Sequence, residues 1–228
     1  MERLNNTNAN TTNPMQMKRI SKNIRLSIEE EYRSAVLECT YVILCDIYKG
    51  LIAVDKYNKR VGEIPSAQLK EVAKWVVTGL KKGLYLWGVC GNGKTTTLNT
   101  IRIFLNAIHQ SYAVGFQPNN MGLRRRWTSG EKLSELGEDE HYTQSVYEAD
   151  VLYIDDLGLD PSVSKRWGEE KHPFAELVQK KYNKNSVVII TSNIKPTDLQ
   201  RRYGERVVDR MKQMFASVEY TERSYRVS

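Results

Sequence analysis

The 228-residue chain lacks an apolar run long enough to cross a membrane. Its longest apolar stretch, Ala35 to Tyr48, is interrupted by Glu38, Thr40 and Asp46, whereas a membrane-spanning helix needs about 18 to 20 apolar residues in a row. The first 25 residues are polar and rich in asparagine, and they do not resemble a secretory signal. We therefore expect a soluble, cytoplasmic protein with no membrane partner.

Cysteine and histidine are scarce, with three residues of each in the chain. The cysteines form no C-x-x-C pair, and the histidines lie far from them in the sequence (Cys39, Cys45, Cys90; His109, His141, His172). This spacing matches no zinc site, and an odd number of unpaired cysteines does not favour a disulfide framework. The absence of a disulfide or zinc framework in the sequence therefore fits a protein of the cytoplasm.

Positive charge exceeds negative charge, with 34 Lys and Arg residues against 27 Asp and Glu, a net charge of +7. The hydrophobic share of 40% excludes a fully disordered chain, but residues 1–25 have the composition of a disordered basic tail. This tail is either a solvated flexible segment or an arm that contacts nucleic acid. The arginine triplet at 124–126 likewise faces DNA or forms a solvated strand edge.

Short apolar runs alternate with helical patterns beyond the tail. Strands are expected at 84–87, 124–128, 151–154, 187–191 and 216–221, and helices at 28–48, from a Ser66 cap onwards, from Lys94 onwards, at 129–136, 173–183, 196–203 and 205–214, with loops at 49–62 and 137–141. Apolar strands that alternate with helices are typical of a parallel sheet covered on both faces. The sequence therefore predicts an α/β fold.

The segment GVCGNGKT, from Gly88 to Thr95, fits the phosphate-binding pattern G-x-x-x-x-G-K-[ST]. It follows an apolar strand and opens an amphipathic helix, so backbone N–H groups and the helix N-terminus converge on one point. Lys94 can reach the β- and γ-phosphates of ATP, Thr95 can ligate Mg²⁺, and Thr96 can touch the α-phosphate. The expected nucleotide-binding residues of this loop are Gly88, Cys90, Gly91, Asn92, Gly93, Lys94, Thr95 and Thr96.

Two simpler interpretations remain for parts of this loop. The glycines could form an ordinary turn between a strand and a helix, although the flanking pattern argues against it. Cys90 is either a small filler residue or an oxidant-sensitive thiol near the converging N–H dipoles.

A second apolar strand, VLYIDD, ends in Asp155 and Asp156. A buried strand aims a carboxylate at a metal with little entropy left to lose. Asp155 is therefore expected to hold Mg²⁺ through a water, and Asp156 to orient or polarise the attacking water. An acidic turn without a catalytic role is the alternative.

Four segments in this order, GVCGNGKT, VLYIDDLG, VVIITSN and GERVVDRM, resemble the AAA+ ATPases of the DnaC/IstB-like group. That group includes bacterial replicative-helicase loaders and transposase-assisting ATPases. The resemblance covers about residues 80–228 and implies a P-loop parallel sheet sandwiched by helices, without a lid domain. A helical segment at 26–60 would then precede an ATPase domain at 61–228.

The resemblance also implies roles for individual residues. Asn193 matches the polar sensor that contacts the γ-phosphate or the attacking water. Arg210 matches an arginine finger that reaches the nucleotide of a neighbouring subunit, and Arg206, four residues earlier on the same helix face, competes for that role. Arg226, in the final SYR motif, matches a residue that acts near the nucleotide.

The resemblance implies an ATPase that uses ATP and Mg²⁺, forms a homo-oligomer with ATP at its interfaces, and acts on single-stranded DNA. Hydrolysis is expected to be slow, because Asp156 stands where many AAA+ proteins have the longer glutamate, and to be stimulated by assembly or DNA. A DnaC-like loader of a replicative helicase is the first interpretation. An IstB-like helper of a transposase and a nucleotide-gated adaptor with little turnover are the alternatives.

Overall fold

The computed structural model describes residues 30–55, 63–113, 123–160, 164–166, 169–221 and 224. The basic tail at 1–25, part of the loop predicted at 49–62, and Arg226 lie outside the described residues, so their interpretations stay predictions. No described helix has both the length and the apolar character needed to span a membrane.

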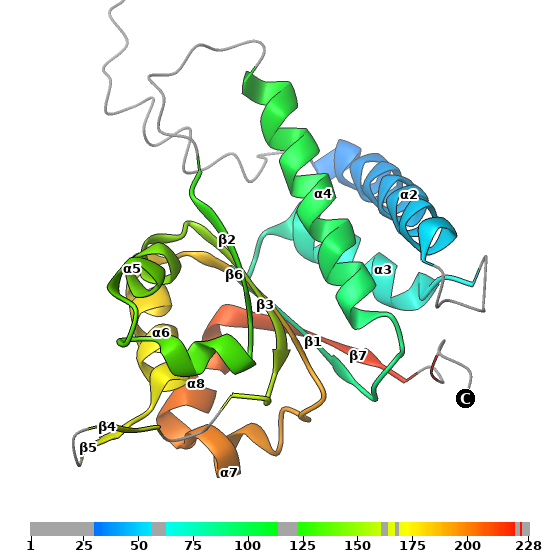
Figure 1. Ribbon diagram of the computed structural model, residues 1–228. Helices are drawn as coiled ribbons and strands as arrows, with labels where there is room; N and C mark the ends of the chain where they lie inside the picture. Colours follow the sequence, from blue (N-terminus) through cyan, green and yellow to red (C-terminus); the bar gives the residue numbers. More distant parts are fainter. Residues whose placement is uncertain are drawn as a thin grey trace, which may run out of the picture.

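A five-stranded parallel sheet forms the centre of the molecule (Figure 1). Its strands are β1 (Gly83–Gly88), β2 (Arg125–Ser129), β3 (Val151–Leu157), β6 (Val187–Ser192) and β7 (Phe215–Tyr220), in the order β2-β3-β6-β1-β7. All five predicted strands are confirmed, with ends that differ by a few residues. Because every strand runs the same way, the residues that follow β1, β3 and β6 meet at one edge of the sheet.

Helices cover both faces of the sheet (Figure 1). One face carries α2 (Glu30–Val54), α3 (Ser66–Thr78) and α4 (Lys94–Ala113), and the other carries η1 (Glu131–Glu135), α5 (Glu140–Glu148), α6 (Pro173–Lys184), α7 (Leu199–Tyr203) and α8 (Glu205–Met214). Alternate strand residues enter the two cores: Leu84 and Leu86 pack with α2–α4, whereas Tyr85 packs with the helices opposite. The predicted α/β sandwich is therefore correct.

The N-terminal helix α2 packs directly on this core. Leu44, Tyr48 and Ile52 are almost fully buried among residues of α3 and α4. The sequence predicted that the helix ends near Tyr48, but it continues to Val54 because Ile52 adds another turn to the same buried stripe.

The ends of α3 differ from the prediction. Ser66 was expected to cap the helix, but Pro65 holds the cap position and Ser66 is the first helical residue. Gly79 ends the helix in a left-handed conformation with φ of 58°, which glycine adopts without a Cβ clash. Gly83 begins β1.

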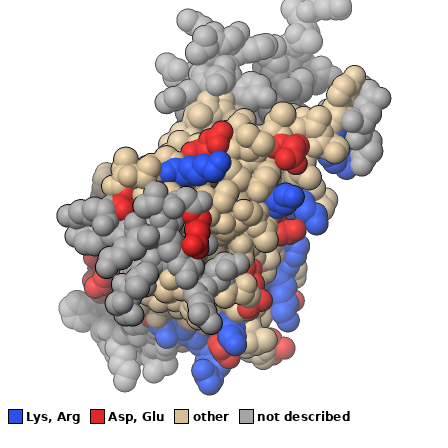
Figure 2. Space-filling view, turned by 90° about the vertical axis from the view of Figure 1, so that its right-hand side faces the viewer, with Lys and Arg blue, Asp and Glu red and all other residues tan. Residues whose placement is uncertain are grey.

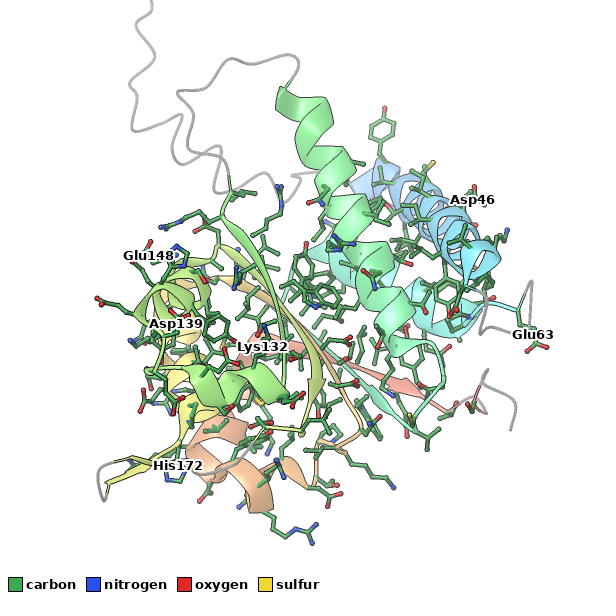
Figure 3. The ribbon with its side chains drawn as sticks, viewed as in Figure 1. Asp46, Glu63, Lys132, Asp139, Glu148 and His172 are labelled. Atoms are coloured by element: carbon green, nitrogen blue, oxygen red, sulfur yellow. The ribbon has the colours of Figure 1, made fainter. Side chains whose placement is uncertain are left out.

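The segment after β2 also differs from the prediction. A helix was expected at 129–136 and a loop at 137–141, but the first is a short 3-10 helix and α5 begins at Glu140. The Asp139 side chain, labelled in Figure 3, accepts the Tyr142 backbone N–H at 2.9 Å and so caps α5. Two short strands, β4 (Ser164–Arg166) and β5 (Glu169–Lys171), pair antiparallel outside the main sheet, and the sequence did not predict them.

Candidate nucleotide-binding site

The loop from Gly88 to Thr95 joins β1 to α4 with a backbone that requires glycine. Gly91 and Gly93 have φ values of 79° and 89°, in the region that disfavours side chains. At Gly88 a Cβ would lie 2.2 Å from the Tyr220 carbonyl oxygen at the end of β7. The glycine pattern therefore reflects a curled loop pressed against a neighbouring strand, and not an ordinary turn.

Lys94 lies inside the curve of this loop. Its side-chain Nζ donates to the carbonyl oxygens of Gly88 at 2.9 Å and Val89 at 2.7 Å, and to the Asn92 Oδ1 at 3.1 Å. Asn92 is fully buried and donates from Nδ2 to the Tyr220 carbonyl at 2.8 Å. The loop therefore holds an ammonium group where an anion gathered by its backbone N–H groups would meet it.

The acidic end of β3 contacts the start of α4. Asp155 Oδ1 accepts hydrogen bonds from the hydroxyl groups of Thr95 at 3.0 Å and Thr191 at 2.6 Å. Burial raises the pKa of the Asp155 carboxyl and the charge of Asp156 raises it further, while the two threonine hydrogen bonds oppose this shift. Thr95 and Asp155 lie 60 positions apart in the sequence, and their side-chain oxygens therefore stand side by side as possible metal ligands.

These two oxygen ligands suit Mg²⁺, which prefers hydroxyl, carboxylate and phosphate oxygens. Within the described residues, no cluster of three or more His, Cys, Asp or Glu side chains could hold a metal ion. A magnesium ion at Thr95 and Asp155 would therefore take the rest of its ligands from phosphate oxygens and water.

Asp156 has an unusual backbone for a residue with a side chain, with φ of 53°. The pairing of β3 with β6 shifts register between Ile154 and Leu157, and the Asp156 N–H donates to the Thr191 hydroxyl at 2.8 Å. Aspartate tolerates this conformation better than most residues, at a cost of about 1 kcal/mol. The bulge therefore turns the second carboxylate away from the direction of a regular strand.

Two residues that the sequence analysis did not single out organise this edge. Thr191, fully buried at the end of β6, bonds both Asp155 and the Asp156 backbone, and a polar residue that ends an apolar strand was the available signal. Tyr220 accepts from Asn92, and its hydroxyl donates to the Thr97 Oγ1 at 2.7 Å. No sequence pattern pointed to Tyr220.

The remaining predicted residues lie in two places. Asn193 is exposed and directly follows β6, at the edge where the loop and the acidic pair lie; Cys90 is exposed and Thr96 is half-buried. Arg206 and Arg210 lie on α8, which Figure 1 shows on the face of the sheet opposite α4. Among the described residues, no hydrogen bond or ion pair joins these arginines to the loop around Lys94.

The surface of α8 is hollowed beside these arginines. Arg210 Nη1 donates to the Arg206 carbonyl oxygen at 3.1 Å. Both side chains line an open depression of about 560 Å³, together with Tyr182, Gln200, Glu205, Val208, Asp209, Lys212 and Gln213. This part of the molecule therefore presents a concave, mixed-charge surface that is separate from the loop.

Residues 48–228 match the protein family described as IstB-like ATP binding protein. This match is wider than the segment of about 80–228 that carries the quoted motifs, and it begins within α2. The chain has no match among curated proteins.

Solved structures with a similar fold include AMPPCP-bound DnaA from Aquifex aeolicus, with 18% identity and a TM-score of 0.50 over 72% of this chain and 50% of that one. The DnaC helicase loader shows 21% identity and a TM-score of 0.46 over 68% of this chain and 89% of that one. DnaA bound to AMPPCP and single-stranded DNA shows 17% identity and a TM-score of 0.49 over 79% and 51%. The chain thus spans about half the length of the DnaA structures, and the likeness concerns the fold.

Proposed function

Since the chain belongs to the family of IstB-like ATP binding proteins, we propose that it binds ATP with Mg²⁺ at the loop 88–95 and hydrolyses it slowly. One observation carries this proposal. The hydroxyl of Thr95, which ends the loop, lies 3.0 Å from the carboxylate of Asp155, at the tip of another strand. A phosphate-binding loop and an acidic strand tip in contact are the parts that phosphoryl transfer to water requires.

In the proposed reaction, the loop N–H groups and the N-terminus of α4 gather the phosphate oxygens. Lys94 exchanges hydrogen bonds to the Gly88 and Val89 carbonyls for bonds to the β- and γ-phosphates. Thr95 and Asp155 would hold Mg²⁺, which supplies positive charge next to the phosphates. The loop thus neutralises the triphosphate with groups that are already in place.

Hydrolysis then needs a water in line with the γ-phosphate. We assign Asp156 to orient this water, because the bulge at the end of β3 turns its backbone away from the regular strand direction. Asn193 would contact the γ-phosphate from the end of β6. Arg210 or Arg206, on the far side of the sheet, would reach the nucleotide of a neighbouring subunit, which makes the active form a homo-oligomer.

We further propose that the ATPase acts on single-stranded DNA in the cytoplasm, as a DnaC-like loader of a replicative helicase. The family match favours the second candidate, an IstB-like helper of a transposase. The third candidate is a nucleotide-gated adaptor. Pulldown of a replicative helicase or of a transposase by the ATP-bound chain separates the first two, and phosphate release separates both from the adaptor.

We also propose that residues 26–60 form an N-terminal segment and that residues 61–228 form the ATPase domain.

The substitution Lys94→Ala tests the nucleotide site. It removes the ammonium that the loop holds for the phosphates, and we expect ATP affinity to fall below detection in isothermal titration calorimetry. Lys74→Ala, an exposed lysine of α3, serves as the control and should bind ATP as the wild type does. Normal ATP binding by a folded Lys94→Ala protein would show that the nucleotide binds elsewhere.

A further inference from the structure

Residues 72–130 contain eight Lys and Arg residues and no Asp or Glu. This stretch of 59 residues includes all of β1, the nucleotide loop, α4 and β2, and it accounts for more than the net charge of the whole chain. Lys94 is used by the loop. The basic residues at the other end of the stretch, on α4 and β2, have no role in the proposed ATPase.

Two of these arginines come together where α4 lies over the outer strand of the sheet. Arg102 of α4 places its guanidinium carbon 5.7 Å from the centre of the Trp127 ring on β2. Trp127 in turn stacks on Tyr153 of β3, with ring centres 6.0 Å apart. Arg125, two residues before Trp127 on the same strand, lies on the same face of the sheet. Both arginines interact electrostatically with the Tyr153 hydroxyl.

This cluster holds several polar atoms without partners. Tyr153 is 1% exposed, and its hydroxyl has no hydrogen-bond partner among the described residues. The same is true of the Nε atoms of Arg102 and Arg125 and of Oδ1 of Asn106, one helical turn beyond Arg102. Buried polar groups in folded proteins are normally satisfied, so a group of unsatisfied ones marks a place where a polar ligand is missing.

The cluster is not an ordinary ion-pair network. Among the described residues, no carboxylate forms a salt bridge with Arg102 or Arg125, and Arg102 donates only to the amide oxygen of Asn99, at 3.1 Å. Arg124, the neighbour of Arg125, differs in this respect. It pairs with Glu148, labelled in Figure 3, and with Asp150 at 3.7 Å. Two cationic groups beside unpaired polar atoms therefore lack a counter-charge.

We propose that Arg102 and Arg125 bind the phosphate backbone of single-stranded DNA. The two guanidinium groups are donors that suit a phosphodiester oxygen, and both arginines are half-buried, so part of each side chain stays open to solvent. This inference deepens the proposed action on DNA and rests on it. Because Trp127 lies between Arg102 and Tyr153, the site contacts backbone without stacking on bases, and binding should not depend on base sequence.

Fluorescence anisotropy with a labelled oligothymidine strand tests this site, with ATP and Mg²⁺ present and the salt concentration varied. The double variant Arg102→Ala/Arg125→Ala should lose roughly tenfold or more in affinity, and the slope of log K against log salt should become shallower by about 1.4, or 0.7 for each phosphate that the protein no longer neutralises. Tyr153→Phe should bind within about twofold of the wild type, because the Tyr153 hydroxyl is buried and DNA cannot reach it. Arg124→Ala, on the same strand but already ion-paired, should bind within about twofold of the wild type.

The outcomes separate this site from the proposed function. If the wild type binds DNA and the double variant binds equally well with the same salt slope, the site is wrong and the DNA-associated function stands. If the wild type does not bind DNA, both are wrong. ATP binding by the double variant, measured by calorimetry, should equal that of the wild type and shows that the fold is intact. If sodium phosphate displaces DNA no better than sodium chloride of equal ionic strength, the site takes the polymer backbone and not free phosphate.

Discussion

The two halves of the proposed ATP site differ in how firmly their side chains are held. Around the loop, Lys94, Asn92 and Thr95 are buried or half-buried. Lys94 bonds to groups of the loop itself, whereas Asn92 and Thr95 bond to β7 and β3. On α8, Arg206 is exposed, and Arg210 bonds only along its own helix. The loop half is therefore held by contacts within one chain, whereas the arginine half presents charged groups to an open depression.

The surface on the side of α2 and α3 gives a further contrast. Figure 2 shows it as mainly neither acidic nor basic, with charged side chains scattered and not gathered into a patch of one sign. Val42, Ile43 and Val54 of α2 are exposed there.

The largest expected effect is a loss of ATP hydrolysis when an arginine of α8 is replaced. Arg210→Ala should bind ATP normally but lose about 10³-fold in hydrolysis at protein concentrations where subunits assemble, because a trans-acting arginine stabilises charge on the γ-phosphate. Phosphate release measured against protein concentration reads this out. Arg206→Ala is the matched variant on the same helix face. If Arg206→Ala loses activity and Arg210→Ala does not, the finger is Arg206; if neither loses activity, α8 takes no part in hydrolysis.

A smaller effect is expected at the loop half, from Asp156→Asn. Asparagine also tolerates the left-handed backbone found at this position, so the substitution changes charge without adding strain. Hydrolysis should fall about 10²-fold while ATP affinity, measured by calorimetry, stays within a few-fold of the wild type. Unchanged turnover would remove Asp156 from the reaction and leave the bulge without a catalytic purpose.

Some features of the proposed site could be predicted from the sequence, and others could not. Gly88 to Thr95 is a local pattern, and its backbone follows from the glycines, so both its position and its contact with β3 could be expected. The φ of Asp156 could not, because it depends on a register shift against β6 and on the Thr191 hydroxyl. The contact of Tyr220 with Asn92 spans 128 positions and leaves no pattern in either segment.

Element boundaries show the same division. The helix 205–214 was predicted at its observed ends, because its apolar residues and its preceding glycine are local signals. The helix α2 was predicted to end six residues too early, since the residue that extends it, Ile52, is buried only by the packing of α3 and α4. Local chemistry therefore fixes where elements lie, and tertiary contacts decide where several of them end.

A loss of folding stability is expected when the contact between α7 and the segment after β3 is removed. The Tyr203 hydroxyl, on α7, donates to Oδ1 of the buried Asp160 at 2.7 Å, and the same oxygen accepts the Gly158 N–H just beyond β3. Tyr203→Phe should reduce the free energy of unfolding by about 2 kcal/mol, because a buried carboxylate loses a donor. Urea denaturation measures this change.

The control for this prediction is Tyr182→Phe. The Tyr182 hydroxyl also makes a hydrogen bond, to Gln213 at 2.9 Å, but the side chain is exposed, so water can bond to Gln213 in its place. Its effect should stay below about 0.5 kcal/mol. Equal effects of the two substitutions would show that the Asp160 contact does not support α7.

The last expected effect is a dependence of stability on pH at a buried lysine. Lys181 of α6 is 1% exposed and donates to the Tyr147 and Ala149 carbonyls at the end of α5. Burial and the positive charge of Lys184 lower its pKa to about 7, Arg124 adds to this shift, and Asp150 opposes it. Above pH 7 the unfolded chain therefore binds a proton at this residue that the folded chain does not.

The sign of this effect follows from that difference in bound protons. The stability of the wild type relative to Lys181→Met should rise between pH 7 and 10 by about 1 kcal/mol per pH unit, and should stay constant below pH 6. Urea titrations across this range measure it, with the exposed Lys180→Met as the control. A difference that does not change with pH would show that Lys181 stays charged when buried.

The most direct test of the central claim is a crystal structure of the chain grown with AMPPCP and Mg²⁺. We predict the β- and γ-phosphates within the curve of residues 88–95, in contact with Lys94, and the metal beside Thr95 and Asp155. A nucleotide bound elsewhere on the chain, with this loop and the tip of β3 still in their present contact, would contradict the claim.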